Sequence, residues 1–118
     1  MRIAVIGAGH AGVEAALAAR KAGASVDLFS DEPMPPYFRP RLVALAFGQA
    51  ERESLLMRPA AWYADQGITL RLDTPVTELD PAARQVRTPQ GRDTYDSLVL
   101  AGGARPVQPD LADAPAAF

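Results

Sequence analysis

Three glycines near the N-terminus have the spacing of an anion-binding loop. They are Gly7, Gly9 and Gly12, in the order Gly-x-Gly-x-x-Gly. In this pattern the first glycine permits a tight turn, the second lets the backbone approach a pyrophosphate, and the third lets a following helix pack closely on a sheet. Backbone N–H groups and the helix dipole then hold the anion, so no cationic side chain is required. The pattern predicts that these residues bind the pyrophosphate of a dinucleotide.

The sequence around the loop predicts the elements that such a site needs. Residues 3–6 form a short apolar run typical of a buried strand, residues 11–22 have helical composition before Gly23, and residues 25–29 again have strand character. Together they predict a β-α-β unit with parallel neighbouring strands. The predicted cofactor-binding residues include His10 and Ala11 inside the loop, although no chemistry is assigned to His10. The alternative is a glycine-rich turn without a ligand.

An acidic side chain after the second strand would bind the ribose hydroxyls of the dinucleotide. Ser30 stands at the strand end, where a carboxylate usually lies, and Asp31 and Glu32 follow it. The prediction is open between Asp31 and Glu32, and the alternative is that both are solvated loop charges. No Arg or Lys follows the strand immediately, so a 2′-phosphate has no obvious partner and NADP is disfavoured at this site.

The rest of the chain predicts short elements and one proline-rich loop at residues 31–40. Helices are expected at residues 41–47 and 59–66, buried strands at 68–72 and 97–101, and an antiparallel β-meander at 76–79, 85–88 and 92–95. The predicted fold class is α/β, a Rossmann-like FAD/NAD(P)-binding fold in which a parallel sheet carries a small antiparallel meander. Residues 1–108 are expected to form the domain, and residues 109–118 an extended tail or the start of a linker.

Composition narrows the classes of function. A net charge of −2 gives no basic field for nucleic acid or an anionic membrane, and no apolar stretch reaches the length of a membrane span. The chain has no cysteine, which excludes a thiol mechanism within it and fits a cytoplasmic location. It offers no candidate acid, base or nucleophile, so we expect the chain alone to catalyse nothing.

Three stretches resemble the pyridine nucleotide-disulfide oxidoreductase superfamily, the flavoproteins with two dinucleotide-binding folds. Within it, the likeness is to the cysteine-free branch of rubredoxin reductases, oxygenase-system ferredoxin reductases and nitrite-reductase-type flavoproteins. The stretches are residues 3–12, residues 32–42, which resemble E-P-x-x-P-Y-x-R-P-x-L, and residues 96–106, which resemble D-x-L-V-L-A-T-G-A-x-P. A weaker likeness of residues 9–19 to flavoproteins that modify the tRNA wobble uridine lacks the cysteine signature of those proteins.

The resemblance implies FAD as the cofactor, with NAD less favoured. FAD's diphosphate would lie on residues 7–12, its ribose near Asp31 or Glu32, and its adenine near the backbone of Val76. The other implied contacts are Arg39, Pro40, Ala101, Gly102 and Gly103. For Arg105, two interpretations stay open from the sequence: it neutralises a phosphate, or it lies in solvent.

The sequence also departs from the family pattern. Gly102 stands where the family usually has threonine, Val43 and Ala44 stand where a serine and a lysine often approach the flavin, and the chain has no second Gly-x-Gly-x-x-Gly. The expected function is the FAD-binding part of an NAD(P)H-dependent oxidoreductase that reduces a redox protein or small acceptor. The alternatives are an NAD-binding domain of a dehydrogenase, or a non-catalytic nucleotide-binding module that assembles with a second copy or another chain.

Overall fold

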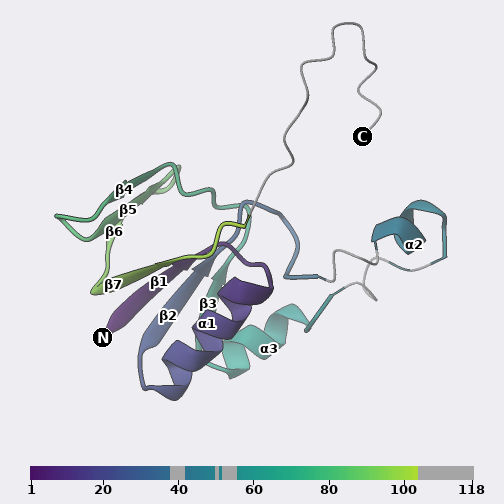
Figure 1. Cartoon of the computed structure of the whole chain (residues 1–118), viewed down its shortest axis with the longest axis horizontal. Helices are drawn as coiled ribbons and strands as arrows, with labels where there is room; N and C mark the ends of the chain where they lie inside the picture. Colours follow the sequence, from purple (N-terminus) through teal and green to yellow (C-terminus); the bar gives the residue numbers. More distant parts are fainter. Residues whose placement is uncertain (38–41, 50, 52–55, 104–118) are drawn as a thin grey trace, which may run out of the picture.

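The computed structural model describes residues 1–37, 42–49, 51 and 56–103. Figure 1 shows a sheet with helices on one face and a small second sheet on the other. The strands are β1 (Arg2–Ile6), β2 (Ser25–Phe29), β3 (Ile68–Arg71), β4 (Glu78–Asp80), β5 (Gln85–Thr88), β6 (Gly91–Thr94) and β7 (Ser97–Leu100). The helices are α1 (His10–Lys21), α2 (Leu42–Ala46) and α3 (Ala60–Asp65).

The main sheet has four strands in the order β3-β2-β1-β7, and every pairing in it is parallel. Strand β1 is central, with Ile6 opposite Phe29 of β2 on one side and opposite Leu100 of β7 on the other. The three chain segments that follow these strands therefore leave the sheet at the same edge. This topology confirms the predicted α/β fold class with a parallel sheet.

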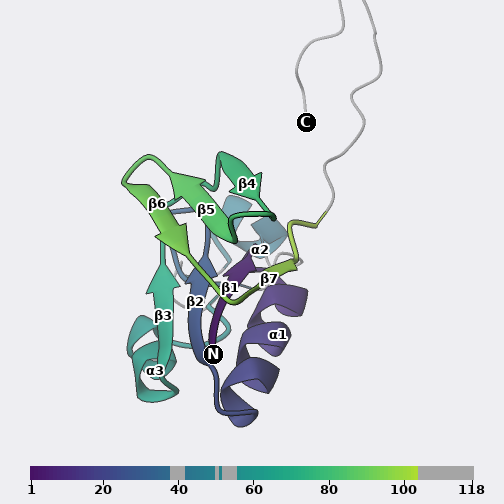
Figure 2. The same cartoon turned by 90° about the vertical axis from the view of Figure 1, so that its left-hand side faces the viewer.

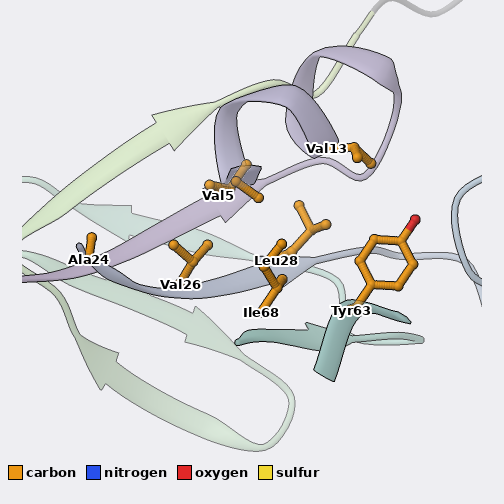
Figure 3. Close-up of a cluster of buried hydrophobic side chains, with 8 residues drawn as sticks. Val5, Val13, Ala24, Val26, Leu28, Tyr63 and Ile68 are labelled. Atoms are coloured by element: carbon orange, nitrogen blue, oxygen red, sulfur yellow. The ribbon is translucent and has the colours of Figure 1, made fainter. Parts of the chain in front are cut away.

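Helices α1 and α3 cover one face of the sheet. Val5, Val26 and Leu28 point to this face and are buried with Val13 of α1 and Tyr63 of α3, as Figure 3 shows. The alternation of side chains along each strand requires this division between faces. The helix layer fixes how α1 lies on β1, and with it the position of the loop that joins them.

Helix α1 ends in a Schellman motif. The Gly23 N–H donates to the Arg20 carbonyl at 2.9 Å, and the Ala24 N–H donates to the Ala19 carbonyl at 3.0 Å. Gly23 has a φ of 94°, which only glycine adopts at little cost. The predicted stop signal is therefore confirmed, and it returns the chain into β2.

The β-meander, β4 to β6, covers the other face of the sheet with an antiparallel order β4-β5-β6 (Figure 2). Val86 and Tyr95 from this layer are buried with Ala4 and Phe29 of the sheet. The meander closes the second face of the sheet, which completes the three-layer arrangement and confirms the predicted small antiparallel insertion.

A polar network joins the meander segment to the sheet around Asp27. This carboxylate lies in the middle of β2 and is only 9% exposed. Its Oδ2 accepts a hydrogen bond from the Tyr95 hydroxyl at 2.7 Å and lies 3.2 Å from the Arg2 guanidinium. Arg71 is 3.7 Å from the same oxygen and 3.3 Å from Asp93. Burial alone would disfavour the charged form of Asp27, and here that charge is paired with the guanidinium groups and the tyrosine hydroxyl around it.

Most element boundaries differ from the prediction by one residue, and the first strand of the meander differs by more. The predicted strand at 76–79 is wrong at its start, since β4 spans Glu78–Asp80. Val76 instead turns inward and packs against the Ala4 and Phe29 cluster, so the chain enters the meander two residues later. The predicted tail at 109–118 lies outside the described residues.

In the described part of the chain, no helix combines the length and apolar character needed to cross a membrane.

Candidate dinucleotide-binding site

The candidate site lies at the carboxyl edge of the parallel sheet. Gly7, Ser30 and Ala101 each follow directly after their strands, and the strand register places these three ends side by side. The chain runs from β1 to β2 and β3 on one side, whereas β7 joins β1 on the other. Strand order therefore reverses at β1. In open α/β sheets, ligands bind at this kind of switch point.

Gly7 and Gly12 fit this loop because neither position has room for a side chain. Gly7 has a φ of 106°, and a Cβ there would overlap the carbonyl of Ala101. A Cβ at Gly12 would overlap the carbonyl oxygen of Gly7. The loop is thus packed tightly against α1 on one side and against the segment after β7 on the other. The structure places Gly7 directly against Ala101.

Gly9 differs from the other two glycines of the motif. Among the residues that the structure describes, no atom lies within 4 Å of a Cβ placed at Gly9, so this side of the loop is open with respect to them. Gly9 is also the N-cap of α1, in extended conformation and without a side-chain hydrogen bond. The first N–H groups of a helix have no intrahelical acceptor. Open space beside a bare helix N-terminus is the arrangement that accommodates a pyrophosphate.

A second part of the site follows β2. Ser30 is 8% exposed, and its Oγ accepts a hydrogen bond from the Glu32 N–H at 3.1 Å. The Asp73 N–H donates to the Glu32 carbonyl at 2.8 Å, and the Thr74 N–H donates to the Ser30 carbonyl at 2.8 Å. The segment after β3 therefore braces the segment after β2. Asp31 is exposed between these fixed residues, and Glu32 is half-buried.

The other predicted site residues fall into three groups. His10 and Ala11 are exposed in the first turn of α1, and Gly102 and Gly103 are exposed after Ala101 at the same sheet edge. The side chain of Val76 packs into the cluster between sheet and meander. Arg39, Pro40 and Arg105 lie outside the described residues.

Two structural features were missed by the sequence reasoning. Asp73 and Thr74 brace the end of β2, and a polar pair directly after a predicted buried strand was the available signal. Asp27 is the centre of the network on the meander face, and its signal was a single charge within an otherwise apolar strand. In both cases the partners are distant in sequence, so their pairing needed the folded topology.

A sequence profile of one family matches residues 1–117, which is almost the whole chain, and its description is pyridine nucleotide-disulphide oxidoreductase. The chain belongs to the pyridine nucleotide-disulphide oxidoreductase family. The resemblance noted from residues 3–12, 32–42 and 96–106 is thereby confirmed.

Several family members are similar in sequence. Rhodocoxin reductase of Rhodococcus erythropolis is 43% identical over 109 residues, covering 89% of this chain and 26% of that protein. Rubredoxin-NAD(+) reductase of Ectopseudomonas oleovorans is 34% identical over 105 residues, covering 86% of this chain and 27% of that protein. The chain spans about a quarter of the length of the curated relatives it matches.

Solved structures of the family have the same fold. The covalent putidaredoxin reductase–putidaredoxin complex matches with a TM-score of 0.81 and 35% identity, covering 96% of this chain and 28% of that chain. NADH:rubredoxin oxidoreductase from Clostridium acetobutylicum matches with a TM-score of 0.77 and 26% identity, covering 91% of this chain and 29% of that one. Each match covers more than nine-tenths of this chain.

Proposed function

We propose that this chain forms the FAD-binding part of an NAD(P)H-dependent flavin oxidoreductase. The observation that carries the proposal is the asymmetry of the glycine loop. Gly7 and Gly12 are closed in by backbone, whereas Gly9 faces open space at the N-terminus of α1. Glycine is a favourable N-cap residue, and its missing side chain also leaves room for a diphosphate. The backbone of residues 9–12 would hold the diphosphate of the cofactor.

The fit of FAD to this chain rests on the shape and chemistry of the described residues. Backbone N–H groups can bind a diphosphate without a charged side chain. At the end of β2, Glu32 and Asp31 offer carboxylates that can accept hydrogen bonds from ribose hydroxyls. FAD bound here would supply redox chemistry that the side chains of this chain lack. The role of the protein residues is to bind the cofactor, orient it and exclude water from it.

The choice of FAD over NAD is testable by absorbance. The purified chain, incubated with FAD and passed through a size-exclusion column, should retain the visible absorbance of the flavin. An NAD-binding domain would instead retain NAD, which is colourless in that range, and would show no flavin uptake. A non-catalytic module that binds neither nucleotide would elute without either one. The proposal predicts the first result, and the others would contradict it.

The activity of a longer protein is also part of the proposal. The named relatives are reductases, and one of the solved structures is a complex with putidaredoxin. By analogy, a complete enzyme would take electrons from NAD(P)H and reduce a small redox protein in the cytoplasm. Another segment or another chain would complete the site. In support of this, Leu100 on the edge strand β7 is 68% exposed.

A further inference from the structure

The main sheet has an open edge at β3. Strand β3 is the last strand on its side of the order β3-β2-β1-β7, and among the described residues no strand pairs with its outer side. Figure 2 shows β3 at the outer side of the sheet, beside α3. An edge strand carries a row of N–H and C=O groups that can pair with another chain. Strand β2 separates this edge from β1 and its glycine loop, so the proposed FAD site does not use it.

The backbone presents three residues to this edge. The N–H of the residue that follows β2 donates to the Arg71 carbonyl at 2.9 Å, so the backbone groups of Arg71 point toward β2. Successive residues of a strand point these groups to opposite sides. Those of Ile68, Leu70 and Leu72 therefore point outward. The Leu72 carbonyl also accepts the Thr74 hydroxyl at 2.7 Å, and its second lone pair can accept another donor.

A groove of about 470 Å³ runs along the same edge, between β3 and α3. Its wall on α3 is formed by Ala60 and Ala64, which lie one helical turn apart and are both exposed. The strand side is formed by Gly67, residues 68–70 and Leu72. None of these described lining residues carries a charge. The edge thus combines outward backbone groups with a mostly apolar surface that another chain can approach closely.

Strand β3 has few of the features that keep an edge strand from pairing. It is short, which is one such feature, but residues 68–71 contain no proline, glycine or lysine. Its one charged residue is Arg71, whose guanidinium lies 3.3 Å from Asp93 and 3.7 Å from Asp27. That charge is therefore engaged on the meander face of the sheet, and it leaves the edge itself open to pairing.

A second copy of this chain matches the edge in an antiparallel register. When Leu70 lies opposite Leu70 of the other copy, Ile68 of each copy lies opposite Leu72 of the other. All three outward residues then exchange N–H···O bonds across the interface. The arrangement is symmetric about a twofold axis at Leu70, as in most protein dimers.

Charges favour the same register. With Leu70 on the axis, Asp73 of each copy lies opposite Gly67 of the other. The Arg20 guanidinium lies beside Gly67, 2.7 Å from where a Cβ would be. A carboxylate and a guanidinium therefore approach each other twice across the interface. A register shifted to place Arg71 opposite Arg71 would instead oppose two like charges.

We propose that two copies of this chain associate through the outer edges of their β3 strands, antiparallel about a twofold axis at Leu70, so that their four-stranded sheets become one continuous sheet. The interface uses neither the glycine loop nor β7. The inference is therefore independent of the proposed FAD site.

Single cysteines test the register, because the chain has no cysteine of its own. Leu70→Cys places two thiols opposite each other with Cα atoms about 5.5 Å apart, within the range of a disulfide. Thr69→Cys is the matched control: its side chain is more exposed, but its two Cα atoms would lie about 8 Å apart, beyond that range. Under air oxidation with a copper catalyst, Leu70→Cys should form the covalent dimer at least about fivefold faster than Thr69→Cys.

Charge variants test the interface in solution, by sedimentation equilibrium of the cofactor-free chain. Thr69 is exposed and lies opposite Arg71 of the other copy in this register. Thr69→Lys should raise the dimer dissociation constant about tenfold, because two like-charge pairs form across the axis. Thr69→Glu should bind at least as tightly as the wild type. Leu100→Lys, at the other edge of the sheet, should leave the constant unchanged.

The contrary outcomes are separate from one another. A wild type that stays monomeric at its highest soluble concentration would overturn the proposal. Equal rates of covalent dimer formation by the two cysteine variants would contradict the register. Dissociation by Leu100→Lys but not by Thr69→Lys would assign the dimer to β7 and overturn the proposal as well. Because no cofactor is added, none of these results bears on whether the chain binds FAD.

Discussion

Gly7 and Gly12 are each closed in by a different piece of backbone, and Gly9 between them is open. The three positions are therefore all glycine, but for different physical reasons. At Gly7 the demand is a φ of 106° and contact with Ala101, and at Gly12 it is contact with the Gly7 carbonyl. At Gly9 no described atom occupies the place of a side chain, and glycine is also a favourable N-cap residue for α1; the proposed pyrophosphate adds a second reason for a missing side chain.

Gly12→Ala should destabilise the fold. The new Cβ would overlap the Gly7 carbonyl oxygen, and because the backbone fixes the position of a Cβ, only a shift of the main chain can relieve the overlap. Overpacking of this kind costs about 2 kcal/mol even after the better helix propensity of alanine is counted. Urea unfolding of the ligand-free chain measures the effect. Gly9→Ala is the matched control and should lose less than about 1 kcal/mol, the loss of a favourable N-cap residue. Equal stability of the two variants would contradict the packing described at Gly12.

The elements of this chain could be predicted well from sequence, because each has a local signal. Buried strands are apolar and short, and α1 ends at a glycine with positive φ. The contacts between elements could not be predicted. Asp27 meets Tyr95 across 68 residues, and the brace of Asp73 on Glu32 joins two loops that are separate in sequence. Local patterns determine which residues form each helix or strand. The sheet topology alone determines which loops come into contact with one another.

The network that ties the meander segment to β2 should contribute to stability. Tyr95→Phe removes the hydroxyl that donates to Asp27 at 2.7 Å and leaves a buried carboxylate with fewer partners. We expect a loss of about 2 kcal/mol in the free energy of unfolding, as for a hydrogen bond to a charged group. Tyr63→Phe is the control, since the buried Tyr63 hydroxyl has no hydrogen-bond partner among the described residues. It should cost nothing or stabilise the chain, and a larger loss there than in Tyr95→Phe would refute this assignment.

The same network predicts a dependence of stability on alkaline pH. Burial raises the pKa of Tyr95 well above its ordinary value, and the hydrogen bond to Asp27 raises it further, while Arg2 opposes the shift. Because the folded-state pKa is raised, this stabilisation is complete below the unfolded tyrosine pKa of about 10 and is lost as pH rises beyond it. Burial also raises the pKa of Tyr63, so part of the effect remains in Tyr95→Phe.

Urea midpoints measured at about pH 8 and about pH 10.5 should therefore fall more steeply for the wild type than for Tyr95→Phe. The buried tyrosine hydroxyl is the group that titrates, so its removal must flatten the curve. An identical slope for both proteins would show that Tyr95 does not carry the predicted shift.

On the scale of the whole molecule, the chain contains one glycine motif of this kind and spans about a quarter of its relatives. The FAD-loaded chain alone should therefore keep its oxidised flavin spectrum when NADH is added anaerobically, because the sequence has no second Gly-x-Gly-x-x-Gly motif to bind the nicotinamide nucleotide. Dithionite, which needs no binding site, should bleach it and serves as the positive control. Rapid bleaching by NADH would show that this part of the protein binds the nicotinamide nucleotide productively by itself.

The most direct test of the FAD site is the affinity of the wild type and Gly9→Ala for FAD, measured by flavin fluorescence. The wild type should bind FAD. Gly9→Ala should keep the fold and bind at least about tenfold more weakly, because its methyl group occupies the space proposed for the pyrophosphate and weakens one or more charge-assisted hydrogen bonds. Equal affinity of the two proteins, or no binding by the wild type, would contradict the account.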